Sequence, residues 1–337
     1  MTVLALCFCI FAYALMLAIV ISISFIIILI TKPYPVIERY EEEETYYDSK
    51  SKTKKRFPNI TEAPTVTLSV VVPAYNEEQR LSPMLDEAIE FLDNRVKEKP
   101  KFSYEIIVVS DGSTDGTVAL VDEYTYLHGS DKIRCLNLIK NRGKGGAVRL
   151  VMAPILPIRG RGLILFADAD GATKFEDLYK LESSMASYTL KDPILQGNQI
   201  EHDMCIVIGS RAHLEKESLA KRSIFRNILM YGFHFLVWFF TVKGIKDTQC
   251  GFKLFTRLAA DKCFHNLHVT RWAFDVELLY IAQKLKIHIL EVPVRWTEID
   301  GSKVTPVLSW IQMGVDLALI WLKYLLGAWK INCKKRN

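Results

Sequence analysis

The sequence lacks the cysteine patterns that mark disulfide frameworks and zinc sites. Its seven cysteines are an odd number, they are scattered along the chain, and no two of them form a C-x-x-C pair. The histidines do not have the spacing of zinc ligands, and no G-x-S-x-G elbow is present to carry a nucleophilic triad. The net charge of +5 is mild for 337 residues and does not require nucleic acid as a partner. We therefore expect reduced thiols, a cytosol-facing protein and no nucleic-acid ligand.

Charged side chains are absent from residues 1–31, and the stretch from Val3 to Ile30 is almost continuously apolar. This run exceeds the ~20 residues that a helix needs to cross a bilayer. A cleaved signal peptide would begin with basic residues and contain a shorter apolar core. The sequence therefore predicts a retained transmembrane anchor over residues 1–31, with the lipid bilayer as a partner.

Basic residues follow this apolar run and do not precede it, at Lys32, Arg39 and in the stretch 49–56. By the positive-inside rule, this distribution places the C-terminal side of the anchor in the cytosol. The sequon at Asn59 would then never be glycosylated.

Residues 32–65 are charged, contain prolines and show no apolar periodicity, which predicts a linker. From residue 66 onward, apolar runs alternate with amphipathic stretches, which predicts an α/β domain over residues 66–305 with a parallel sheet covered on both faces. The expected strands are 67–75, 104–112, 133–140 and 162–171, and the expected helices lie near 81–98, 115–127 and 144–156.

Three of the expected strands end in polar loops, at 73–78, 110–117 and 168–173. Ligands of open parallel sheets bind beyond the carboxyl ends of the strands. We therefore expect these loops to converge on one crevice.

The third loop, "DADGAT", contains Asp168 and Asp170, about 6–7 Å apart in extended chain. Two adjacent carboxylates repel each other, and a divalent cation removes that cost. Mg²⁺ or Mn²⁺ prefers oxygen ligands and leaves room for substrate phosphates. The pair therefore predicts a metal that holds a diphosphate; the alternative is a solvated acidic loop.

Two further loops allow two interpretations each. In "SDGSTDGT", Asp111 could contact a nucleotide base, or the stretch could be only a turn and a helix cap. The stretch "NRGKGGAVR" at 141–149 fails both the P-loop and the G-x-G-x-x-G patterns. It could begin a helix near the nucleotide, or it could be a structural turn.

The second half contains two strongly apolar segments, 221–242 and 306–329. Each fits a helix that lies in the membrane interface, and a buried core helix is the alternative for the first. Asp316 and Lys323 make a transmembrane span at the second segment less favourable. We expect residues 306–337 to form an amphipathic membrane-associated helix and a basic tail.

Together, "VVVPAYNEE", "VVSDGSTDGT", "FADADGAT", "GSR", "DTQCGFKLF" and "EVPVRWTEIDGSK" resemble the inverting GT-A glycosyltransferases that load a sugar onto a polyprenyl phosphate. The resemblance runs from Thr67 to Trp329. It implies a Rossmann-like, mostly parallel sheet in an α/β catalytic domain, with an N-terminal transmembrane helix and C-terminal interfacial helices.

The resemblance also implies roles for individual residues. The residues that correspond to the donor-nucleotide pocket are Pro73, Tyr75, Glu77, Val109, Asp111, Asp168 and Ala169. Asp170 corresponds to the metal ligand, with Asp168 beside it, and Arg211 and Lys303 match basic contacts to donor or acceptor phosphate, so that Asp170, Arg211 and Lys303 are the expected catalytic residues. To these we add Arg222 and Arg226, which begin a membrane-facing segment and could bind acceptor phosphate. Ser110 and Ala172 depart from the pattern of mannosyl relatives, which leaves the base preference and the full metal coordination open.

The implied donor is UDP-glucose, the implied acceptor is dolichyl phosphate, and the implied location is the endoplasmic reticulum membrane, where the product serves N-glycan precursor assembly. Alternatives are another polyprenyl-phosphate sugar transferase, such as a mannosyl enzyme, and a non-catalytic membrane-tethered nucleotide-sugar-binding protein. His268 stands where processive synthases carry Gln, which argues against a polymerase. A phosphate acceptor is already ionised at neutral pH, so we expect no essential catalytic base, with Asp275, Glu277 and Asp247 as the rival candidates.

Overall fold

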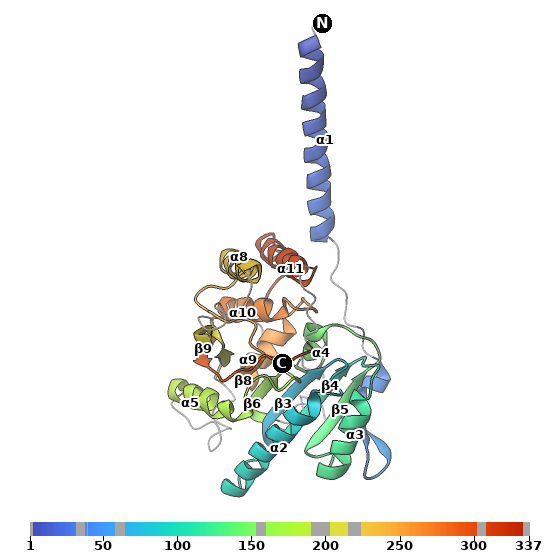
Figure 1. Ribbon diagram of the computed structural model, residues 1–337, viewed down its shortest axis with the longest axis vertical. Coiled ribbons are helices and arrows are strands. Elements are labelled where there is room, and N and C mark those ends of the chain that lie inside the picture. The colour runs from blue at the N-terminus through green and yellow to red at the C-terminus, as the bar shows by residue number, and fades with distance from the viewer. Residues whose placement is uncertain are drawn as a thin grey trace.

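The computed structural model describes residues 3–31, 38, 40–57, 65–152, 160–189, 203–214, 224–301 and 308–332. The first element, α1 (Val3–Thr31), projects away from the rest of the molecule (Figure 1). Its segment Ile10–Ile27 has a mean hydropathy of 2.7, and none of it is buried. The helix is therefore long and apolar enough to cross a membrane, as the sequence predicts.

A seven-stranded sheet forms the centre of the body, with the strand order β5-β4-β3-β6-β8-β7-β9. Neighbouring strands run parallel except where β8 meets β6 and β7. The strands are β3 (Val66–Ala74), β4 (Tyr104–Asp111), β5 (Ile133–Leu138), β6 (Gly160–Ala167), β7 (Cys205–Ser210), β8 (Phe252–Thr256) and β9 (His288–Pro293). The expectation of an α/β fold with a mostly parallel sheet is confirmed.

Helices cover both faces of this sheet, which explains why most residues of its central strands are apolar. In β3, Val70 and Val72 belong to one hydrophobic cluster and Val71 belongs to the other. The first cluster takes in α2 (Leu81–Glu98), α3 (Thr117–His128) and α5 (Leu178–Thr189). The second takes in α4 (Lys144–Met152), α9 (Arg257–His265), α10 (Phe274–Lys284) and α11 (Leu308–Leu325).

The structure differs from the expected linker over residues 40–57, which are folded onto the body. They form the short helix η1 (Glu41–Glu44) and the antiparallel hairpin of β1 (Thr45–Asp48) and β2 (Thr53–Arg56). Tyr46 and Phe57 are buried, and their rings lie 5.4 and 5.7 Å from the guanidinium of Arg134. Arg134 is buried and pairs with Glu105, so the hairpin covers a charged pair. The many exposed charges of this segment hide its two buried aromatic residues in the sequence.

Two apolar helices lie side by side at the end of the body that faces α1, namely α8 (Ile224–Phe240) and α11 (Figure 1). Phe233 and Val237 of α8 are buried against the body, whereas Phe235, Trp238 and Phe239 are more than half exposed. The sequence of residues 221–242 is compatible with a core helix and with an interfacial helix. Within α8, both kinds of face are present.

Candidate active site

The polar loops after β3 and β4 are joined by hydrogen bonds between side chains and main-chain groups. The Asn76 side-chain oxygen accepts from the main-chain N–H of Thr114 at 2.8 Å. The main-chain N–H of Glu77 donates to the Thr117 hydroxyl at 2.8 Å, and Glu78 accepts from the N–H of Gly116 at 3.1 Å. Pro73 and Val109 are register partners near the ends of the two strands. The expected convergence of these two loops is therefore present.

Asp111 lies at the end of β4 and is 3% exposed. Its carboxylate accepts the main-chain N–H of Arg142 at 2.8 Å, and it also accepts from the N–H of Gly143. Burial raises the pKa of Asp111 to about 6 despite these hydrogen bonds. Gly143 has φ +79°, and a Cβ there would lie 2.6 Å from the Thr270 carbonyl oxygen. The glycine-rich stretch is thus a tight turn at Gly143 followed directly by the start of α4, and the turn supports Asp111.

Tyr75 and Glu77 lie in the loop that follows β3, and Glu77 is buried. Glu77 forms a two-point ion pair with Arg80, with oxygen–nitrogen distances of 2.7 and 2.6 Å. Tyr75 is 39% exposed. The positive charge of Arg80 is stabilised by Glu77 and by the more distant Asp170 and Asp168, which raise its pKa although burial lowers it.

Asp168 follows β6 and is held by two contacts. Its Oδ1 lies 2.7 Å from Nζ of Lys144, and its main-chain N–H donates to the carbonyl of Gly251 at 2.9 Å. A Cβ on Gly251 would lie 1.9 Å from an Asp168 carboxylate oxygen, so a larger residue cannot occupy this place without displacing the carboxylate. Burial would lower the pKa of Lys144, but the charges of Asp168, Asp275 and Asp170 outweigh it.

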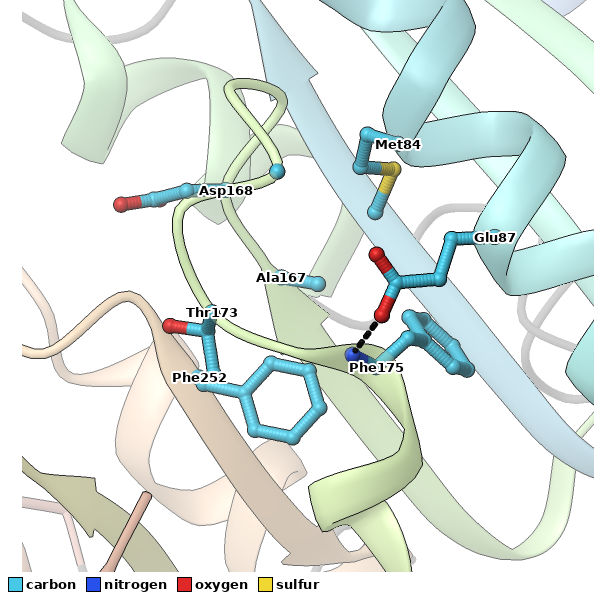
Figure 2. A pocket seen from close by; sticks show the side chains of 8 residues that line it. Met84, Glu87, Ala167, Asp168, Thr173, Phe175 and Phe252 are labelled. Carbon is cyan, nitrogen blue, oxygen red and sulfur yellow. Dashed lines mark hydrogen bonds between the residues drawn. The ribbon is translucent and has the colours of Figure 1, made fainter. Parts of the chain in front are cut away.

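Asp170 and Ala169 complete this loop. Ala169 is buried, and Asp170 accepts the main-chain N–H of Ala172 at 3.0 Å. A pocket beside the loop is lined by Met84, Glu87, Ala167, Asp168, Gly171, Thr173, Phe175 and Phe252. Figure 2 shows that the Asp168 carboxylate points away from Glu87, which accepts the N–H of Phe175 at 2.9 Å. The loop is connected to the Asp111 side of the sheet through Lys144, which follows the turn at Arg142 and binds Asp168.

The donor set fits a divalent cation that is bound together with a diphosphate. Within the described residues, no group of three or more His, Cys, Asp or Glu side chains could hold a metal by itself. Two carboxylates at one strand end, supplemented by phosphate oxygens and water, are a typical set for Mg²⁺. Ala172 supplies no side-chain oxygen, so Asp168 and Asp170 would be the protein ligands.

Arg211, at the end of β7, is bound by an acid. Its Nε and Nη2 lie 2.7 and 2.9 Å from the two carboxylate oxygens of Asp247, and its guanidinium lies 5.4 Å from the Trp296 ring centre. Burial would raise the pKa of Asp247, but hydrogen bonds and the charge of Arg211 hold it below its usual value. Three of the five guanidinium N–H bonds remain outside this pair.

The remaining expected phosphate ligands are not placed by the structure. Arg222 and Lys303 lie outside the described residues, and for Arg226 only the backbone within α8 is described. Three basic residues that pair with carboxylates are not predicted from the sequence, namely Arg80, Lys144 and Lys253. A lysine inside the apolar run "CGFKLF" was the available signal for Lys253.

The three acids that could have served as a base are all engaged elsewhere. Asp275 accepts from Nζ of the fully buried Lys253 at 2.6 Å, and Asp247 binds Arg211. Glu277 accepts from the main-chain N–H of Val269 at 2.6 Å and from the Tyr324 hydroxyl at 2.9 Å. Each therefore joins structural elements.

The chain is similar to known proteins in sequence and in fold. Residues 69–264 match the family described as Glycosyl transferase family 2. Dolichyl-phosphate beta-glucosyltransferase from Drosophila melanogaster is 57% identical over 89% of this chain and 88% of its own length. The protein of the same name from Homo sapiens is 57% identical over 88% of each chain. The crystal structure of mannosyl-3-phosphoglycerate synthase from Rubrobacter xylanophilus is 17% identical, with a TM-score of 0.45, and the match covers 79% of this chain and 76% of that chain.

The chain belongs to glycosyl transferase family 2, and the expected GT-A fold and glycosyltransferase class are confirmed. Its curated relatives at 52–57% identity carry the name dolichyl-phosphate beta-glucosyltransferase.

Proposed function

We propose that this chain transfers glucose from UDP-glucose to dolichyl phosphate with inversion, giving dolichyl β-D-glucosyl phosphate for N-glycan precursor assembly. The observation that carries the proposal is the 57% identity, over most of both chains, to enzymes named for glucosyl transfer to this lipid. Contacts that connect the three polar strand-end loops, two of them through Arg142 and Lys144, support a matching site there.

In this proposal the donor lies across the ends of β3, β4 and β6. Asp111 accepts a hydrogen bond from the uracil base, and Tyr75 and Glu77 border the nucleotide. The negative charges of Asp168 and Asp170 raise the pKa of both Lys144 and Arg80 and so favour their charged forms. They would offset the repulsion between these carboxylates and the donor diphosphate.

Asp168 and Asp170 would hold Mg²⁺ or Mn²⁺ on the diphosphate. When bound, the metal would neutralise charge on the departing UDP as a Lewis acid. The chain itself contributes the fixed position of Asp168, which Lys144 and the Gly251 carbonyl hold from two sides.

The acceptor phosphate would approach from the membrane side. Arg211, Arg222, Arg226 and Lys303 are the proposed phosphate ligands, because a guanidinium binds phosphate through two parallel hydrogen bonds. The exposed aromatic face of α8 and the neighbouring α11 would rest on the bilayer that α1 crosses.

No protein base is needed in this mechanism. A phosphate monoester has a second pKa of about 6 and is mostly a dianion at neutral pH. It attacks the anomeric carbon in line, and UDP leaves with the bonding electrons. The engagement of Asp247, Asp275 and Glu277 in structural contacts supports this view.

The test is a donor-turnover assay with the full-length chain, with and without dolichyl phosphate. UDP-glucose should be consumed only with the lipid, to give a β-linked product, while GDP-mannose should not react. Preference for GDP-mannose would favour the mannosyl alternative. Binding without any turnover would favour a non-catalytic binding protein.

We further propose a catalytic domain on the cytosolic surface of the endoplasmic reticulum, supported by the basic residues after the anchor. In sealed microsomes, external protease should remove everything after about residue 40. Glycosylation of Asn59 in cells would contradict this orientation.

A further inference from the structure

The segment that follows α1 contacts the donor side of the sheet through a buried carboxylate. Glu43, in η1, is 1% exposed and pairs with both terminal nitrogens of Arg142, at 2.8 and 3.0 Å. One of its oxygens also accepts the main-chain N–H of Ile139 at 3.0 Å. A buried acid with these partners has a fixed geometry, since losing any of them leaves charge uncompensated.

Arg142 connects this carboxylate to the donor pocket. Its side chain binds Glu43, and its main-chain N–H donates to Oδ1 of Asp111 at 2.8 Å. The guanidinium also donates to the carbonyl of Glu38 at 2.8 Å. The Arg142 side chain is therefore bound by Glu38 and Glu43 of the segment that follows α1, and its main chain is bound by Asp111.

Tyr40 strengthens the same contact. Its hydroxyl accepts from Nζ of Lys140 at 2.6 Å, and its ring centre lies 5.1 Å from that nitrogen and 5.5 Å from the Arg142 guanidinium carbon. Tyr40 and Glu43 of the segment that follows α1 thus both contact the turn at residues 140–143, which donates a hydrogen bond to Asp111.

We propose that Glu43 is a positioning residue for donor binding, which fixes the Arg142 turn and through it the Asp111 carboxylate. This inference rests on the proposed function, in which Asp111 contacts the donor base. Glu43 itself touches no substrate. Its loss would let the turn at residues 142 and 143 shift, and Asp111 would lose the N–H groups that orient it.

The test compares Glu43→Gln with Glu44→Gln in the full-length protein, reconstituted in lipid vesicles. Glu44 is the neighbouring acid of η1, and it pairs with the exposed Arg56. For Glu43→Gln, we expect the KM for UDP-glucose to rise about tenfold, the scale of one lost charge-assisted hydrogen bond. The affinity for UDP, measured by calorimetry, should fall in parallel, while kcat and the KM for dolichyl phosphate stay unchanged. Glu44→Gln should match the unaltered protein in every constant.

A second variant keeps the inference testable if Glu43→Gln is too unstable to purify. Arg142→Lys retains the charge but not the two-point contact, so it should raise the KM for UDP-glucose by a smaller factor. In the Glu43→Gln background, Arg142→Lys should add little, because the pair is already broken. An unchanged KM for UDP-glucose in Arg142→Lys would overturn the positioning role, as would equal effects of the Glu43 and Glu44 substitutions.

Asp111→Asn separates this inference from the proposed function. If Asp111→Asn leaves UDP affinity unchanged, the assignment of Asp111 to the donor pocket is wrong. If Asp111→Asn weakens UDP binding while Glu43→Gln and Arg142→Lys do not, the pocket assignment stands and the positioning role of Glu43 is wrong.

Discussion

Two pairs of acidic side chains, one near β4 and β6 and the other near β7 and β8, are held in different ways. Near β4 and β6, Asp111 accepts a hydrogen bond from the main-chain N–H of Arg142 in the turn after β5, and Asp170 accepts one from the main-chain N–H of Ala172 in its own loop. Near β7 and β8, Asp247 and Asp275 pair with the side chains of Arg211 and Lys253. Main-chain contacts orient a carboxylate and preserve its charge for a ligand, whereas a buried ion pair uses that charge to join elements.

This difference indicates which acids serve substrate binding and transfer and which stabilise the fold. Substitutions on the β4 and β6 side should change substrate binding and transfer with little effect on folding. Substitutions of the paired acids should change folding first. The following experiments would sharpen or break that division.

Asp275→Asn should cause the largest loss of stability. It leaves the fully buried Lys253 without its acid, which costs about 3–5 kcal/mol in free energy of unfolding for a buried pair. Denaturant unfolding measures this cost. Single-turnover transfer by the folded fraction should stay within about tenfold of the unaltered protein, because no base is lost.

The amides Asp247→Asn and Glu277→Gln extend this experiment. If any of the three variants keeps its fold and both substrate affinities but loses transfer ~1,000-fold, the scale of a lost general base, the base-free mechanism is wrong.

Asp170→Asn should reduce transfer more than ~100-fold, comparable to the loss of one strong electrostatic contact in the transition state. Its midpoint of thermal unfolding should barely change, since its contact is with the N–H of Ala172. Excess chelator should abolish transfer in the unaltered protein, and Mn²⁺ or Mg²⁺ should restore it. The exposed Asp86 on α2 supplies the control. Asp86→Asn should leave the rate of transfer and the midpoint of thermal unfolding unchanged. Full activity in chelator would refute the metal proposal.

Arg211→Lys should lower transfer about tenfold although the charge is kept, because lysine cannot make two parallel hydrogen bonds. Arg295 offers a matched control, since its guanidinium and main-chain N–H bind Asp177 in the same way. Arg295→Lys should disturb folding to a similar extent without raising the KM for dolichyl phosphate. Identical kinetics in the two variants would make Arg211 purely structural.

The smallest expected effect is a pH dependence of donor binding. The pKa of Asp111 is raised to about 6, so its carboxylate gains a proton as the pH falls through that value and ceases to accept a hydrogen bond from the base. UDP-glucose affinity should fall about fourfold between pH 7.5 and 5.5 if only the ionised form binds. Stability should move in the opposite direction, because a buried acid with a raised pKa costs stability at neutral pH and regains it towards its unfolded pKa. Calorimetry with UDP-glucose measures the affinity, and Asp111→Asn should remove its pH dependence.

The strands of the body could be predicted from sequence because a sheet covered on both faces requires continuous apolar runs, as in residues 66–74 and 104–111. The carboxylates at the strand ends could be predicted as candidate ligands, because open parallel sheets bind ligands beyond the carboxyl ends of their strands. The partners of those carboxylates could not be predicted in the same way. Lys144 meets Asp168, and Glu43 meets Arg142 across 99 positions, only because the fold brings distant turns together. The hairpin was missed because two aromatic residues among many charges show no periodicity.

The shortness of the connection after α1 has a kinetic consequence. Thr31 ends the helix and Glu38 already lies on the body, so seven residues limit their separation to about 25 Å. With α1 in a bilayer, this connection holds the body close to the surface in which a lipid acceptor diffuses. The encounter with the acceptor becomes a lateral search at high effective concentration, and only the water-soluble donor has to arrive from the bulk.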